Sequence, residues 1–332
     1  MTRILGIESS CDDTAVAIVE NGGQILSNVT ATQAIHRRFG GVVPELASRD
    51  HLRRIWTTVE AALDDAGLTI ADIDYVAATH GPGLVGSLLV GVSFARGVGL
   101  AREIPTVAVN HLEAHIFVHR VHSAPAPGPF LALLVSGGHT ELIRVNRIGD
   151  LTILGATRDD AAGEAFDKVG KVLGLGYPAG PEIDQLAEEG DPRAVSFPRA
   201  RLGPASLDFS FSGLKTAVAT HVASLPSPPV GETLRDISAS FQQAVVDVLV
   251  EKTVAAAESE DLSTVVLAGG VAANRRLRAD LAAALSSVGR TLVTSPIHLC
   301  TDNGVMVAVA GGLRVDAGLA EPVRNADPNL AL

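Results

Sequence analysis

The chain has 332 residues, a formal net charge of −11 and a hydrophobic content of 47%. That length allows two domains, each with its own core, and the composition argues against a disordered chain. The negative charge argues against a free-standing nucleic-acid binder, because phosphate contacts need clustered cations. A nucleic-acid substrate would need a partner or a local basic cluster, and the candidates are Arg37-Arg38, Arg49 with Arg53-Arg54, and Arg275-Arg276 with Arg278.

Cysteine usage and hydropathy indicate a cytoplasmic protein with no membrane association. Cys11 and Cys300 provide no disulfide framework, which is typical of a reducing compartment. No apolar run before Asp12 is long enough for a signal peptide. The apolar stretch 83–101 contains two serines and one arginine and is rich in glycine. It therefore predicts a buried helix rather than a membrane span.

The first part of the chain predicts a three-stranded meander followed by alternating helices and strands. We expect an added helical segment near 30–66, with a helix running to about Ala66. In chain order, the expected strands are 4–8, 14–19, 24–26, 73–79 and 106–109, and a helix is expected at 84–102.

The meander then recurs about 126 positions later, and the offset grows to 187 at the second His-Leu motif, 298 against 111. Strands are expected at 130–135, 140–145, 151–154, 264–267 and 291–294, with a helix at 274–288. The second copy carries an insertion near 155–231, which holds a helix around 163–169, a glycine–proline loop at 174–181 and a helix after Phe211. Such a duplication predicts an α/β protein with two lobes, 1–125 and 126–332. Each lobe has a mixed sheet flanked by helices, and a ligand cleft is expected between the lobes.

Two histidines, His111 and His115, are four residues apart on an expected helix, so they lie on one face. The sequence His-Leu-x-x-His at 111–115 returns as His-Leu-x-x-Asp at 298–302, with Asp302 in place of the second histidine. We therefore predict a two-histidine, one-carboxylate metal site for zinc or ferrous iron. The alternative is a pair of histidines that merely hydrogen-bond within the helix. A zinc-peptidase motif is missing, because Leu112 stands where the catalytic glutamate belongs.

Glycine-containing turns supply further candidates. The turn Ser136–Thr140 offers backbone amides that can hold a phosphate, whereas its first-copy equivalent, Ser9–Thr14, is acidic and suits a metal or a proton. The turn at Gly269-Gly270 allows a flat base to lie close to the backbone, with Asn274 hydrogen-bonding that base or simply capping a helix. The remaining candidates are Asp167 and Asp184 for ribose hydroxyls, with solvated helix acids as the alternative, and Gly180 for a close approach.

The duplicated unit resembles the actin, sugar-kinase and Hsp70-type superfamily. Six motifs in order resemble the bacterial tRNA N6-adenosine threonylcarbamoyltransferase family, once described as a sialoglycoprotein endopeptidase, and the match runs from about Ile4 to Gly312. They are GIESSCDDT at 6–14, HGPG at 80–83, NHLEAH at 110–115, SGGHT at 136–140, DFSFSGLK at 208–215 and GGVAAN at 269–274.

This resemblance implies transfer of a threonylcarbamoyl group from threonylcarbamoyl-adenylate to the N6 amine of the adenosine 3′ of the anticodon, in tRNAs that read A-starting codons. It implies one divalent ion, usually Fe²⁺ and in some members Zn²⁺, held by His111, His115 and Asp302. The implied partners are a degenerate paralogue, paired through the first lobe's helices, and a small ATPase. The implied substrate-binding positions are Leu134, Val135, Ser136, Gly137, Gly138, Asp167, Gly180, Asp184 and Asn274.

An acyl-adenylate is already activated, so the chemistry requires positioning and charge neutralisation, which a Lewis-acid metal supplies. Glu8, Asp12 and the leaving phosphate are the candidate acceptors of the amine proton. Cys11 as a nucleophile is a weak alternative, because no cation adjoins it in sequence. Two other function classes remain: a nucleotide-driven kinase or ATPase, which gives the histidine pair no role, and a non-catalytic paralogue, which should have lost it.

Overall fold

The computed structural model describes residues 1–121, 128–200, 202–203 and 206–332. It divides into two compact units, each described here by itself. Unit 1 comprises Met1–Ala126, Asn146–Leu151 and Ser295–Leu332, and unit 2 comprises Pro127–Val145 and Thr152–Thr294. The boundary expected at residues 125 and 126 lies outside the described residues. The segment 295–332, which the sequence pattern places in the second lobe, belongs to unit 1.

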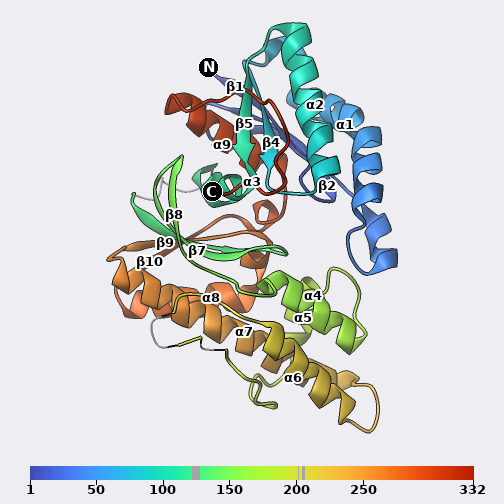
Figure 1. Ribbon diagram of the computed structural model, residues 1–332, viewed down its shortest axis with the longest axis vertical. Helices are drawn as coiled ribbons and strands as arrows, with labels where there is room; N and C mark the ends of the chain where they lie inside the picture. The colour runs from blue at the N-terminus through green and yellow to red at the C-terminus, as the bar shows by residue number, and fades with distance from the viewer. Residues whose placement is uncertain (122–127, 201, 204–205) are drawn as a thin grey trace. The chain divides into compact units, whose positions relative to one another are not determined.

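Unit 1 is built on a five-stranded mixed sheet with helices on both faces (Figure 1). The strand order is β3-β2-β1-β4-β5, in which β1 pairs antiparallel with β2 and parallel with β4. The strands are β1 (Arg3–Glu8), β2 (Asp13–Glu20), β3 (Gln24–Thr32), β4 (Tyr75–Gly81) and β5 (Thr106–Asn110). The helices are η1 (Ala34–Phe39), α1 (Pro44–Ala66), η2 (Ile70–Asp72), α2 (Val85–Arg102), α3 (His111–Phe117), η3 (Val118–Val121), η5 (Ile297–Leu299) and α9 (Gly304–Asp316).

Unit 2 repeats this sheet. Its strand order is β10-β9-β6-β7-β8, with β6 antiparallel to β7 and parallel to β9, so each strand has the place of its counterpart in unit 1. The predicted duplication and fold class are thereby confirmed. The strands are β6 (Phe130–Val135), β7 (Thr140–Arg147), β8 (Asp150–Ala156), β9 (Thr264–Ala268) and β10 (Thr291–Thr294). The helices are α4 (Ala162–Leu173), α5 (Gly180–Ala187), α6 (Ser212–Ala223), α7 (Gly231–Ser259), η4 (Gly270–Ala273) and α8 (Arg275–Ser287).

The structure also corrects some element boundaries. The strand expected at 24–26 continues to Thr32, and the loop expected at 174–181 ends earlier, because α5 begins at Gly180. Gly174 ends α4 in the left-handed conformation, with a φ of 78°, which glycine adopts without steric cost. The 29-residue helix α7 and the core helix α9 carried no clear signal in the sequence.

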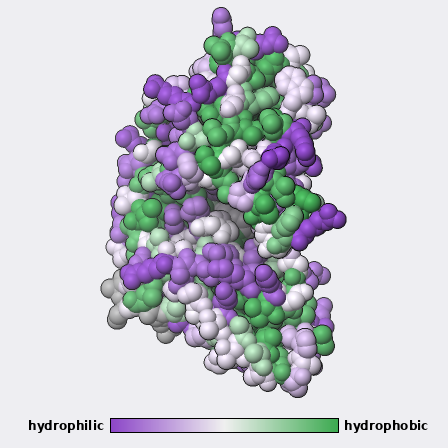
Figure 2. Space-filling model, turned by 45° about the vertical axis from the view of Figure 1, so that its right-hand side comes forward, coloured by the Kyte–Doolittle hydropathy of each residue, from purple (hydrophilic) through white to green (hydrophobic). Residues whose placement is uncertain are grey.

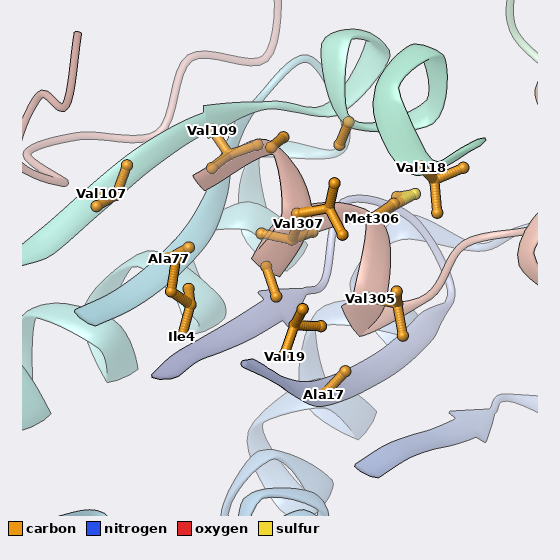
Figure 3. Packing of buried hydrophobic residues seen from close by; sticks show 14 of the residues in the cluster. Ile4, Ala17, Val19, Ala77, Val107, Val109, Val118, Val305, Met306 and Val307 are labelled. Carbon is orange, nitrogen blue, oxygen red and sulfur yellow. The ribbon is translucent and has the colours of Figure 1, made fainter. Parts of the chain in front are cut away.

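The sheet of unit 1 is buried on both faces, because alternate residues of each strand point to opposite sides. Ile4 of β1 packs toward α9, whereas Leu5 and Ile7 pack toward α1 and α2. Figure 3 shows the apolar cluster between the sheet and α9. In it, the strand residues Ile4, Ala17, Val19, Ala77, Val107 and Val109 lie against Val305, Met306 and Val307 of α9.

Helix α9 approaches the sheet at a distance that only glycine permits. A Cβ at Gly6 would collide with the carbonyl of Gly304 and lie 2.5 Å from the amide nitrogen of Ala308. A Cβ at Gly304 would collide with the backbone of Val16 and Ala17 on β2. Two glycines that face each other therefore set the distance between sheet and helix.

Within the part of the chain that the structure describes, α2 is the one helix long and apolar enough to cross a membrane. Such a single helix is weak evidence for a span. Its residues Leu88, Val92 and Ala95 are buried, and the helix packs against α1 and β4. Only 28% of the helix is buried, so it packs with one face and is not the fully buried helix that the sequence predicts.

Substituting Gly6→Ala should destabilise unit 1 by about 1–3 kcal/mol or more, because the new methyl group meets backbone atoms that cannot rotate away. Urea denaturation followed by circular dichroism measures the change. The matched control is Gly97→Ala on the exposed side of α2, where a Cβ meets nothing within 4 Å. This control should stabilise the helix by about 0.5–1 kcal/mol. Equal stability of the two variants would contradict the packing argument.

Candidate functional site

The short helix α3 begins directly where β5 ends. Asn110 is its N-cap, and the side-chain Oδ1 accepts hydrogen bonds from the amides of Leu112 (2.9 Å) and Glu113 (3.2 Å). An asparagine cap stabilises a helix that is too short to persist by propensity alone. The cap therefore places His111 at the first position of the helix and His115 one turn further along the same face.

The structure brings His111, His115 and Asp302 together inside unit 1. One ligand atom from each lies within 4.8 Å of the others. Asp302 Oδ1 is 3.1 Å from Nε2 of His115 and 3.7 Å from Nε2 of His111. The two rings meet edge to face, with centroids 4.7 Å apart. This donor set is the one predicted for a divalent metal, although Asp302 comes from the same compact unit as the histidines.

Glu8, at the end of β1, fixes the orientation of His111. Its Oε2 lies 3.0 Å from His111 Nδ1 and accepts a hydrogen bond from the Thr79 hydroxyl at 2.7 Å, and its Oε1 accepts one from the Ser10 amide. Because a carboxylate only accepts hydrogen bonds, Nδ1 of His111 carries the proton. The opposite nitrogen, Nε2, therefore faces Asp302 and is the ring atom available to a metal ion. A buried carboxylate behind a histidine is a common second layer of metal sites.

The pKa shifts of the three ionisable groups indicate that the space around His111, between Glu8 and Asp302, favours positive charge. Burial alone would lower the pKa of His111, but the carboxylates of Glu8 and Asp302 raise it to about 9. Burial would raise the pKa of Asp302, but His111 and His115 bring it to about 2. The pKa of Glu8 is likewise lowered by His111 against the effect of burial. A proton on His111 and a divalent cation thus compete for the same place.

His115 is the most deeply buried of the three side chains. Its ring is 2% exposed, and its Nδ1 has no hydrogen-bond partner among the described residues. An unpaired polar atom inside a protein costs free energy and is uncommon. The opposite nitrogen, Nε2, faces Asp302 at 3.1 Å and is the atom that this ring offers to a shared ligand. The two imidazoles and the carboxylate are a donor set that fits a divalent metal ion.

Glu113, the acid nearest to the histidines in sequence, is not available as a peptidase base. It is 2% exposed, and its carboxylate accepts hydrogen bonds from the amide of Gly149 (2.8 Å) and the guanidinium of Arg314. Both partners belong to unit 1, so this buried ion pair ties α3 to α9. Glu113 therefore does not substitute for the missing peptidase glutamate.

The acidic loop Ser9–Thr14 lies beside the centre. His51 of α1 holds it, with Nδ1 2.7 Å from the Thr14 hydroxyl and Nε2 3.0 Å from the Cys11 carbonyl. Burial raises the pKa of the Cys11 thiol, and the acids around it raise it further, which disfavours Cys11 as a nucleophile. Burial also raises the pKa of Asp13 to about 7. Neither His51 nor the Thr79 contact had a sequence signal, whereas Asn110 could have been recognised as an N-cap.

In unit 2, the glycine turns lie at the carboxyl ends of the parallel strands β6 and β9. Leu134 and Val135 are fully buried on β6, and the turn Ser136–Gly138 follows, with Ser136 Oγ accepting hydrogen bonds from the amides of Gly138 and His139. The Ser136 carbonyl accepts a hydrogen bond from the amide of Gly163 at the start of α4 (3.1 Å). A Cβ at Gly269 would lie 2.5 Å from the Val135 carbonyl, so the two turns are adjacent.

The polar residues predicted to bind substrate all have protein partners. Asn274 caps α8 and donates to Gln242 Oε1 at 2.8 Å, Asp167 accepts from the Ala179 amide at 2.8 Å, and Asp184 pairs with Arg275 at 2.7 Å. Gly180 opens α5 with free space where a Cβ would be. Asp184, Gln242 and Arg275 line a cavity of about 310 Å³. Substrate binding by these residues stays a prediction.

Comparisons with known proteins identify the relatives of this chain. The model of the family "tRNA N6-adenosine threonylcarbamoyltransferase" matches residues 24–309. Enzymes of that name are 50% identical in Magnetococcus marinus, over 100% of this chain and 98% of the relative, and 53% identical in Anaeromyxobacter dehalogenans, over 99% of each. A Bacillus cereus relative is 49% identical over 99% of this chain and 96% of its own length. This shared name favours the transferase over the kinase and scaffold alternatives.

Solved structures with low sequence identity support the fold alone. Component A of (R)-2-hydroxyglutaryl-CoA dehydratase from Acidaminococcus fermentans has a TM-score of 0.56 at 16% identity, covering 95% of this chain and all of that one. A ROK hexokinase from Thermus thermophilus has a TM-score of 0.53 at 15% identity, covering 96% of this chain and 100% of that one. Both agree with an actin-like or sugar-kinase-like fold.

The metal-free chain should lose stability as the pH rises from about 6.5 to 9. The pKa of His111 is raised in the folded state from 6.5 to about 9, so its pairing with Glu8 and Asp302 stabilises the fold fully below 6.5. This contribution fades as the proton leaves near pH 9. Urea midpoints of chelator-treated protein, measured across that range, should fall less steeply for Glu8→Gln. An unchanged slope in Glu8→Gln would contradict the pairing.

Proposed function

This chain belongs to the tRNA N6-adenosine threonylcarbamoyltransferase family, and we propose that it performs the transfer with a metal ion bound by His111, His115 and Asp302. The observation that carries this proposal is the convergence of these three side chains within 4.8 Å, backed by Glu8. The acyl donor is threonylcarbamoyl-adenylate, and the acceptor is the N6 amine of the adenosine 3′ of the anticodon in tRNAs reading A-starting codons.

Two histidines and one carboxylate leave coordination positions open, which suits Fe²⁺ better than a closed structural zinc site, with Zn²⁺ as the alternative. When bound, the ion polarises the acyl carbonyl and neutralises the charge that develops on its oxygen. The protein contributes orientation: Glu8 holds the Nδ1 proton of His111, so that Nε2 is presented in the neutral form. Metal analysis of protein purified without air distinguishes the two ions.

The amine of adenosine must lose a proton during the transfer. Glu8 is fully buried and already bonded to His111, Thr79 and Ser10, so its role is to orient the ligand. Asp12 is only partly buried, and it therefore suits proton acceptance better, together with the leaving phosphate. Unit 2 would hold the adenylate at Leu134–Gly138, Asp167, Gly180, Asp184 and Asn274.

Replacing both His111 and His115 by alanine should abolish metal binding and transfer. The chain should still fold but with lower stability, because Glu8 and Asp302 lose their imidazole partners. Asp302→Asn should weaken metal binding as well, since the amide carries no charge. Metal content by mass spectrometry and transfer to tRNA transcripts measure the two effects. Full transfer by a demetallated double variant would refute the metal proposal.

The control for this experiment separates metal binding from proton transfer. Asp12→Asn should keep the metal and slow the transfer by a factor on the order of 10²–10⁴, which is typical for the loss of a general base. Loss of metal in this variant would place Asp12 among the ligands instead.

We further propose that the degenerate paralogue pairs with the helical face of unit 1, and that a small ATPase completes the assembly. Leu52 (70% exposed) and Trp56 (58%) lie on α1, and Val85 (53%) and Leu89 (47%) lie on α2. The two helices pack against each other, and Trp56 contacts Phe94. The upper part of Figure 2, which carries these helices, shows hydrophobic groups among hydrophilic ones. Exposed apolar patches of this kind mark protein interfaces.

The basic residues on η1 and α1 support a shared role in attracting tRNA. Arg49 pairs with Glu45 and Arg54 with Asp50, while Arg37, Arg38 and Arg53 are exposed. With a net charge of −11, the chain needs a partner to bind tRNA tightly. A tRNA substrate and two cysteines that form no disulfide support a cytoplasmic location.

Trp56→Glu should abolish co-purification with the paralogue, because it places a charge at the centre of an apolar contact. The matched control is Leu100→Glu, another exposed apolar residue (86%) at the end of α2. Sedimentation of the mixed proteins measures pairing. Equal loss of pairing in both variants, or in neither, would place the interface elsewhere.

A further inference from the structure

The segment 321–331, called the strap below, runs along the edge strand of the unit 1 sheet. Its Glu321 carbonyl accepts a hydrogen bond from the Ala108 amide of β5 (2.8 Å), and its Val323 amide donates to the Thr106 hydroxyl (3.1 Å). The Arg96 guanidinium of α2 donates to the Arg324 carbonyl (2.8 Å). These backbone contacts anchor the strap before it reaches the candidate metal centre.

The strap next covers an irregularity at the end of β4. The register between β4 and β5 shifts between Thr79 and Gly81. His80 therefore has no paired residue on β5, and its carbonyl is free to accept a hydrogen bond from elsewhere. The amide of Asp327 donates to that carbonyl at 2.7 Å. A Cβ at Gly81 would collide with the Asp327 carbonyl and lie 2.8 Å from Leu330, so a glycine is required where the strap crosses. Thr79, just before the bulge, donates to Glu8, the partner of His111.

A second contact leads to the same histidine through a turn. The Pro328 carbonyl accepts a hydrogen bond from the Gly83 amide (3.2 Å), and the following Leu84 amide donates to the Ser10 carbonyl (2.8 Å). Ser10 Oγ lies 3.2 Å from Nδ1 of His111.

A third contact reaches the helix itself. The Asn110 side chain caps α3 with its oxygen and donates from Nδ2 to the Ala331 carbonyl at 3.0 Å. One side chain therefore joins the strap to the first turn of the metal-binding helix. The bond to Ala331 fixes the rotation of the amide and thus the position of the capping oxygen.

Three independent contacts of the strap thus end on the surroundings of His111. We propose that the strap segment Asp327–Ala331, together with Asn110, is a positioning element that fixes the orientation of His111 at the metal centre. This inference rests on the proposed function. It assigns a role in metal affinity to a segment that contributes no ligand to the site and lies more than two hundred residues from His111 in sequence.

Two variants test the inference with Zn²⁺ as the probe, titrated against a competing chelator. One removes residues 329–332 and so deletes the Ala331 carbonyl, and the other is Asn110→Ser, which keeps a capping oxygen but loses the Nδ2 donor. Each should weaken Zn²⁺ binding by roughly 10-fold, as loss of a supporting hydrogen bond typically does, with the thermal midpoint unchanged. The combined variant should lose no more than the truncation alone, because the truncation already removes the Ala331 carbonyl to which Asn110 donates.

The matched control is Arg324→Ala, which removes an exposed strap side chain but keeps every strap backbone contact, and its Zn²⁺ affinity should equal that of the parent. Hydrogen exchange of the Leu112 and Glu113 amides in metal-free protein is the second readout. It should accelerate in both test variants and not in the control. Unchanged affinity and unchanged exchange would overturn the inference while leaving the proposed function intact. Failure of the parent chain to bind Zn²⁺ or Fe²⁺ would overturn the proposed function itself.

Discussion

The close contact between α9 and the sheet of unit 1 is the constraint on which the candidate site depends. Gly6 and Gly304 let the helix backbone rest directly on β1 and β2, and valines of α9 fill the space around them. Asn303 caps α9 through a hydrogen bond to the Met306 amide, and Asp302 precedes that cap. The depth at which the helix sits therefore decides how far the Asp302 carboxylate is from the two imidazoles.

Charge balance explains why the remaining polar groups of the site are arranged as they are. The buried carboxylate of Glu8 and the half-buried one of Asp302 flank His111 on opposite ring nitrogens. Two acids so placed in a buried site require a cation between them, since isolated buried charges are costly. The pKa of His111, raised to about 9, favours the protonated imidazole in metal-free protein, and the same field suits a metal ion. The orientation of the ring and the affinity for a cation thus have one common cause.

The sequence predicted those parts of the structure that follow from local pattern. The alternation of apolar residues predicted the strands of both sheets, and the duplication predicted their common order. The four-residue histidine spacing and its repeat at 298–302 predicted His111, His115 and Asp302 as ligands of one site. Contacts that depend on strand order and helix packing could not be predicted. Thr79 reaches Glu8 because β4 lies beside β1. The segment 295–332 belongs to unit 1 because α9 packs on the sheet of that unit. In unit 2, Asn274 caps α8, which was the alternative interpretation of this residue in the sequence. Its role in binding a substrate is still a prediction.

The division of the chain has a consequence for its synthesis on the ribosome. The strands of unit 1 emerge early, but α9, which covers one whole face of their sheet, is translated almost two hundred residues later. All of unit 2 is made in the interval and can fold as a body of its own. Until α9 arrives, Ile4, Val19 and Val109 remain exposed to water, and Asp302 is still missing. The nascent N-terminal half therefore exposes an apolar sheet face to which chaperones can bind, and the cation site can close only after Asp302 has been translated.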